Sequence, residues 1–278
     1  MANYQSYKKI QGDQAIIANS VTASQTTGLA LGNQKQLYVY NTDITGHNNG
    51  GCCCLWTVPA GTTAIKFELT GGGGSGGVGH CCANGIPGGS GAYAVKTLCS
   101  SQFTPGSTQY TICAGGSTEC SVCGACQSCW CCGRRGCRSY VTGSGLSNFC
   151  ANGGTWGWQQ CSGGCHTCNH QRHWDAICVG TEAPFYGADF GIRGKSATRQ
   201  QNNECRGDWW QFSADGVGPY GVGGARSVDM CTNSPWWKGC CIGLNAYFGG
   251  GGFSPYTDGS CCWSGWGSGG LVVVTYWS

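Results

Sequence analysis

The chain has 278 residues, of which 52 are glycine and 25 are cysteine, while Asp, Glu, Lys and Arg together make up only 10%. The 12 Trp, 12 Tyr and 8 Phe are too many for a disordered glycine-rich chain, which lacks aromatic residues and is rich in charge. A formal net charge of +3 is too small for an electrostatic grip on nucleic acid, so we predict no nucleic-acid partner. This composition is not that of a typical cytoplasmic enzyme, and we predict a protein without enzymatic activity.

The first residues contain no apolar segment before a small-residue cleavage site, and no window holds the roughly 20 apolar residues of a membrane span. We therefore expect neither conventional secretion nor a membrane-embedded protein. High cysteine density, however, is typical of oxidising compartments. Either the thiols stay reduced and hold metal in a cytoplasm, or the protein leaves the cell by lysis, as a virus particle does.

Residues 1–50 contain no cysteine and are rich in Asn, Gln, Thr and Ser. The change in composition near residue 50 predicts a boundary, and we interpret 1–50 as an attachment or packing arm. Within it, QAIIA and KQLYVYN have the composition of short strands.

From residue 51 to 278, short β-type runs alternate with glycine-rich turns, and no stretch of 12 or more residues shows a helical apolar period. The predicted strands are LWTVP, AIKFELT, AYAVKTLC, STQYTICA and GLVVVTYW. This pattern predicts an all-β domain, a glycine-rich sandwich or jelly-roll-like fold. The strand at 270–277 should pair in the same sheet as the segment 56–69, because both are apolar and need a shared buried face.

Residues 119–180 carry 12 cysteines and few aliphatic residues, which predicts a loop-rich insertion stapled by disulfides. Adjacent cysteines occur at 52–54, 81–82, 131–132, 240–241 and 261–262. Neighbouring side chains of a strand face opposite sides, so we expect each pair to bond to two different partners. The odd cysteine count leaves at least one thiol free, metal-bound or intermolecular.

The glycine runs at 71–77 and 248–253 allow two interpretations. Such tracts are often flexible linkers. Alternatively, they form extended backbone packed so closely that neighbouring chains leave no room for a Cβ. A basic cluster, Arg134, Arg135 and Arg138, lies among glycines and cysteines, and we expect it to form a solvated turn.

Four motifs occur in a recognisable order: CLWTVPAGTTAIKFELTGGGGSGG, GGSGAYAVKTL, TPGSTQYTICAGG and GSGGLVVVTYW. Together they resemble the glycine-rich domain of phage tail-fibre proteins, in a cysteine-rich variant such as those of cyanobacterial phages. The resemblance covers about 52–117 and 268–278 and leaves 118–267 without a template. It implies a β fold and a place in the virion.

Two clusters have spacings at which the side chains of each could converge on one metal centre. Zinc is the cofactor that either would hold, and an iron–sulfur cluster is a further alternative for the first. They are Cys120, Cys123, Cys126 and Cys129, and Cys165, Cys168, His170 and His173. A chain with 25 cysteines produces such spacings readily, so we favour disulfides in both clusters and expect no cofactor.

A further set of residues could recognise a glycan on a host surface, with aromatic rings stacking on sugars beside a polar neighbour. The set is Trp209, Trp210, Trp236, Trp237, Tyr220 and Asp208. The alternative is that these tryptophans fill a core that is short of Leu and Ile. We favour this second interpretation.

These observations predict a structural protein of the phage virion, a tail-fibre or surface-appendage component that contributes to host attachment. It would assemble in the host cytoplasm and be released by lysis. Its expected partners are other virion proteins through 1–50, further copies of itself, with a trimer favoured for a fibre, and a host surface glycan. The alternatives are a capsid or neck decoration protein and a cytoplasmic zinc-binding protein.

Overall fold

The computed structural model describes ten parts of the chain, and the following account concerns these alone. They are residues 34–40, 51–76, 88–118, 133–157, 182–195, 198–201, 209–212, 217–219, 248–252 and 266–278. Within these ranges the only helical element is a single 3-10 turn, Ser100–Gln102, and no helix is long and apolar enough to cross a membrane. The predicted all-β class is confirmed.

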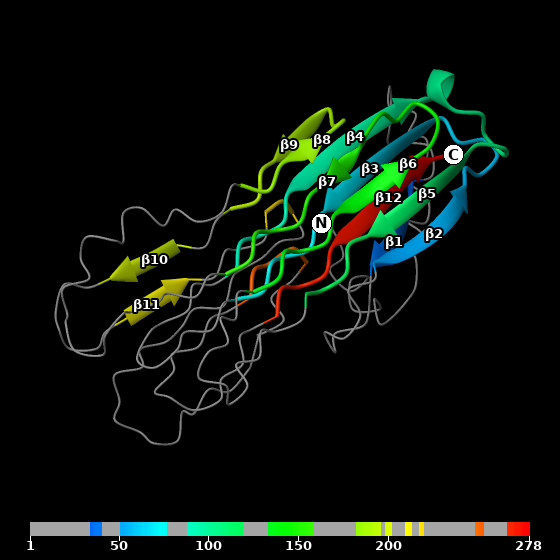
Figure 1. Ribbon diagram of the computed structural model, residues 1–278. Coiled ribbons are helices and arrows are strands. Elements are labelled where there is room, and N and C mark those ends of the chain that lie inside the picture. The colour runs from blue at the N-terminus through cyan, green and yellow to red at the C-terminus, as the bar shows by residue number, and fades with distance from the viewer. Residues whose placement is uncertain are drawn as a thin grey trace, which may run out of the picture.

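Two five-stranded antiparallel sheets pack face to face as a sandwich (Figure 1). The first has the order β1 (Gln34–Tyr40), β12 (Leu271–Trp277), β3 (Ala64–Thr70), β4 (Tyr93–Cys99), β9 (Phe190–Ile192). The second has the order β2 (Cys52–Thr57), β5 (Gln109–Ala114), β6 (Ser139–Thr142), β7 (Cys150–Ala151), β8 (Phe185–Tyr186). A separate pair joins β10 (Thr198–Gln201) to β11 (Trp209–Phe212).

The predicted closure of the sheet by the C-terminal strand is confirmed. β12 pairs with β3 over its whole length, from Leu271 opposite Thr70 to Trp277 opposite Ala64. The front of the predicted partner segment differs, because Trp56 and its neighbours form β2 in the other sheet. Between the two strands the chain turns at Pro59 and Gly61, whose positive φ of +79° suits glycine.

Two regions of the sandwich lie where the sequence suggested other roles. β1 belongs to the segment 1–50, yet it pairs with β12 at every residue. β6 and β7 fall inside the segment 119–180, which the sequence predicts to be loop-rich. Val141 of β6 and Phe149, which directly precedes β7, are buried in the core, and this burial accounts for ordered structure there. The rest of both segments lies outside the described residues, so the arm boundary and the stapled insertion stay predictions.

Aromatic rings supply much of the core between the sheets. Phe67 of β3 packs edge-on against Tyr110 of β5 with centroids 5.1 Å apart, and Phe149 lies 6.4 Å from Phe67. Burial raises the pKa of Tyr110 to about 12, so its hydroxyl stays protonated and donates to the carbonyl oxygen of Ser144 at 2.9 Å. These contacts explain how a chain poor in aliphatic residues builds a core.

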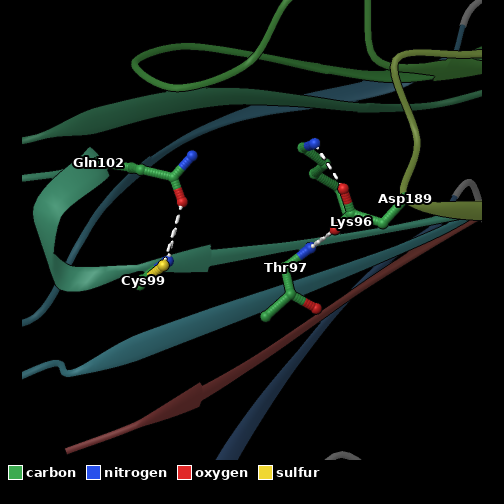
Figure 2. A network of polar contacts seen from close by, with 5 residues as sticks. All are labelled: Lys96, Thr97, Cys99, Gln102 and Asp189. Carbon is green, nitrogen blue, oxygen red and sulfur yellow. Dashed lines mark hydrogen bonds and ion pairs between the residues drawn. The ribbon is translucent and has the colours of Figure 1, made fainter.

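A polar network joins the loop before β9, the edge strand of the first sheet, to its neighbour β4 (Figure 2). Asp189 lies in the loop between β8 and β9. Its carboxylate accepts from the Nζ of Lys96 at 2.6 Å and from the backbone N–H of Thr97 at 2.9 Å. These hydrogen bonds, first the one from Lys96, hold the pKa of Asp189 below its ordinary value of 3.8. At the end of β4, the strand that carries Lys96 and Thr97, the side chain of Gln102 in the following 3-10 turn accepts from the backbone N–H of Cys99 at 3.0 Å.

Asp189→Asn should lower the melting temperature at neutral pH but not in strong acid. Because the folded pKa is depressed, the carboxylate contributes stability above pH 3.8, and this contribution is lost as the pH falls through the lowered value. The Asp189 side chain is 48% exposed, so we expect a loss of no more than about 1 kcal/mol. Melting curves of both proteins between pH 2 and 7 test this, and a constant difference across that range would contradict it.

Candidate recognition end of a glycine bundle

Glycine-rich segments continue from one end of the sandwich, at the lower left of Figure 1, and lie side by side. We call this unit the glycine bundle. It comprises residues 71–76, 88–92, 115–118, 133–137, 152–157, 249–252 and 266–270.

The hydrogen bonds of the segment 71–76 repeat every three residues. Gly71 and Gly74 donate to the segment 88–92, Gly72 and Ser75 to 133–137, and Gly73 to 266–270, all at 2.8–2.9 Å. Three residues per turn without internal hydrogen bonds is the geometry of a polyproline II helix. The segment 88–92 follows the same rule, since Gly88 and Gly91 share one neighbouring segment and Gly89 and Ala92 share another.

The segment 71–76 is the centre of the bundle and is buried throughout. Besides the three segments to which it donates, it accepts from Gly154 and Gly157 at 2.8 Å and from Gly252 at 2.7 Å. On the remaining side, a Cβ on Gly72 would lie 2.8 Å from the carbonyl oxygen of Gly116.

Six segments therefore surround this central helix, and glycine is required because the backbones touch. A Cβ on Gly73 would overlap the carbonyl oxygen of Gly250, and one on Gly74 would overlap that of Thr155. For the described glycines of the two runs, the close-packed interpretation is confirmed and the flexible linker is wrong.

Hydroxyl side chains complete the hydrogen bonding where the backbone pattern is interrupted. Ser75 Oγ accepts from the N–H of Arg134 at 2.6 Å, and Thr118 Oγ1 accepts from that of Gly267 at 2.9 Å. Since a buried N–H without an acceptor costs about 1–3 kcal/mol, these hydroxyl side chains contribute to the stability of the bundle.

Six of the seven bundle segments connect the sandwich strands to the same end of the bundle. The segments 71–76, 115–118 and 152–157 follow β3, β5 and β7, while 88–92, 133–137 and 266–270 precede β4, β6 and β12. Within the described part of these six segments, the residues farthest along the chain from the sandwich strands are therefore Gly76, Gly88, Thr118, Gly133, Gly157 and Trp266. We call this the distal end, and it is the candidate functional site.

The predicted glycan-binding residues are only partly placed by the structure. Trp209 and Trp210 begin β11, where their backbone pairs with Gln201 and Gln200 of β10. Tyr220, Asp208, Trp236 and Trp237 lie outside the described residues, so the role of this set stays a prediction.

The candidate zinc ligands also lie outside the described residues. They are Cys120, Cys123, Cys126, Cys129, Cys165, Cys168, His170 and His173. Over the described ranges, no three His, Cys, Asp or Glu side chains gather closely enough to hold a metal.

Among the described cysteines, one disulfide joins directly opposed positions of β2 and β5, Cys53 and Cys113. Cys52 and Cys54, which flank Cys53 in the chain, are free thiols. Burial raises the pKa of Cys54, and the nearby Cys52 adds to this shift. Burial likewise raises the pKa of Cys150, against an opposing effect of Arg138. Cys54 and Cys150 are therefore poor thiolate nucleophiles.

On the surface of the bundle, the sequence pattern misplaced two arginines and gave no indication of an exposed tryptophan. Arg134 and Arg135 are exposed as expected, but they belong to an extended segment of the bundle and not to a turn. Trp156, on the neighbouring segment 152–157, is 37% exposed. Its only signal in the sequence is a single large ring within the run NGGTWG.

The sequence matches no model of a known protein family and no curated protein.

Proposed function

We propose that this protein is a structural component of a phage virion, a tail-fibre or surface-appendage protein that presents the distal end of its glycine bundle to the host. The observation that carries the proposal is the common direction of the bundle segments. Six of the seven segments carry the chain to, or back from, the distal end of the bundle. A non-enzymatic attachment protein of the virion needs this kind of platform.

The physical basis of such a platform is its backbone. Hydrogen bonds between main-chain atoms join the central segment 71–76 to five of the segments that surround it. The contacts that hold the described bundle together therefore depend little on the identity of its exposed side chains. Surface loops on a rigid scaffold are where proteins concentrate recognition.

The sandwich provides the opposite, inward-facing part of the proposed appendage. β1 and β2 are the outer strands of their sheets in the described structure, and such edges can pair with another chain. β1 belongs to the segment 1–50, through which we propose contacts to other virion proteins and to further copies of the chain in a trimer.

Fluorescently labelled protein should bind saturably to cells of the host that is infected by the phage carrying this protein. The resemblance to fibre proteins of cyanobacterial phages makes cyanobacterial strains the expected hosts. Preincubation with the unlabelled protein should reduce phage adsorption, since both compete for one receptor. Protein unfolded by heat serves as the control and should do neither. Absence of binding to every susceptible strain would contradict the attachment function.

A further inference from the structure

The exposed large apolar side chains of the sandwich all lie on its edge strands, as far as the described residues extend. They are Tyr38 and Tyr40 of β1, Leu55 of β2, Tyr186 of β8, and Phe190 and Ile192 of β9. Edge strands are usually protected by charged residues, proline or bulges, because their open backbone can pair with another chain. Apolar side chains gathered at an edge instead favour contact with a protein.

β1 and β2 lie together on one lateral side of the sandwich, opposite the side formed by β8 and β9 (Figure 1). We call it the β1–β2 side. Its strands have seven and six residues, against two and three in β8 and β9. Lys35 is the one charged residue of β1 and β2. The opposite side is bordered by two ion pairs, Lys96 with Asp189 and Arg193 with Glu182. The β1–β2 side is therefore the longer and less charged of the two.

The apolar residues of the β1–β2 side lie on both outer faces of the sandwich. Val39 is buried in the core, so the alternation of a strand places Tyr38 and Tyr40 on the outer face of the first sheet. Trp56 packs against the core, so its neighbour Leu55 lies on the outer face of the second sheet. One edge thus carries two apolar patches that face away from each other.

Such an edge fits further copies of the same chain. When three copies meet with this side at a common axis, the tyrosines of each copy lie against Leu55 of the next, and the contacts close into a ring. An axis parallel to the strands keeps all glycine bundles at one end, as presentation of the distal end to a host requires. A twofold axis across the strands would point two bundles in opposite directions.

We propose that three copies associate through the β1–β2 side, with Tyr38 and Tyr40 of one copy packing on Leu55 of the next. Removing these side chains from water stabilises the contact. A surface with little charge can meet its own copies without repulsion between like charges. The inference names the contact of the proposed trimeric appendage, and its biological role rests on that proposed function.

The test is the mass of the full-length protein in solution, measured by sedimentation velocity over a range of concentrations. Non-reducing gels verify that no disulfide joins the copies. Wild type should sediment as a trimer. Leu55→Lys and Tyr38→Lys should each weaken association about 100-fold or more, because the lysine would be buried without a partner. Phe190→Lys is the matched control. Phe190 is 58% exposed against 64% for Leu55 but lies on the opposite side, and its variant should stay trimeric.

Combining Tyr38→Lys with Leu55→Glu in one chain tests which faces meet. Each new lysine then lies against the glutamate of the next copy, so association should recover about tenfold or more relative to either single change. A double variant that associates no better than the single ones would overturn the packing of Tyr38 on Leu55.

A monomeric wild type would overturn the inference, as would dissociation by Phe190→Lys or a trimer unchanged by Leu55→Lys and Tyr38→Lys. Melting curves verify that each variant folds, and Tyr38→Lys decides the matter should Leu55→Lys fail to fold. Host-cell binding separates the two proposals. A protein that forms trimers through this side but binds no host cell supports the contact and contradicts attachment. A monomeric wild type that binds host cells supports attachment and overturns the contact.

Discussion

Replacing Gly73 with alanine should prevent the protein from folding to a soluble form. Gly73 lies in the central helix of the bundle, and the added Cβ would overlap the backbone oxygen of Gly250. Neither backbone can retreat, because both are hydrogen-bonded to further segments on their other sides. We expect a destabilisation of about 3 kcal/mol or more, since overpacking costs that much where nothing can shift. Soluble yield and urea unfolding measure the effect.

Gly269→Ala is the matched control within the same bundle. A Cβ at this position would lie 3.5 Å from its nearest neighbour, the carbonyl oxygen of Gly115, which is an ordinary contact. We expect this variant to fold with little change in stability. Similar behaviour of the two variants would show that glycine at position 73 is not required by packing.

Deleting residues 271–278 should produce insoluble protein. The deletion removes β12 from between β1 and β3, and with it four consecutive buried residues from Leu271 to Val274. Their burial is worth roughly 6 kcal/mol or more, which is comparable to the whole stability of a domain. Deleting Ser278 alone removes nothing from the strand and should be neutral. A soluble and compact protein lacking 271–278 would contradict the described sheet.

The strands of the sandwich could be predicted where short apolar runs are bounded by turn residues. β3, β4, β5 and β12 all have this form, and turn chemistry at Pro59 and Gly61 separates β2 from β3. β6 and β7 fall in the segment 119–180, for which 12 cysteines and few aliphatic residues predict a loop-rich insertion. Strands of four and two residues are too short to show a period that would have indicated them. β1 coincides with the strand predicted from KQLYVYN, but its place in the sheet was not predicted, because the composition that indicates an arm carries no information about strand pairing.

For the glycine bundle, the sequence indicated close backbone packing only as one of two interpretations. Glycine runs indicate close packing, but the choice between linker and packed backbone depends on what lies beside them in space. Trp156 was missed for the same reason, since the segments hydrogen-bonded to 152–157 come from other parts of the chain. The predicted tryptophan doublets and cysteine clusters fall mostly or wholly outside the described residues and remain predictions.

Immunogold electron microscopy of purified phage particles, with antibodies raised against this protein, tests the proposed attachment role most directly. The account predicts gold at the outer ends of tail fibres or other surface appendages. Gold on the capsid or neck would identify a decoration protein. Its absence from particles, with the protein present in the host cytoplasm, would contradict a virion role altogether.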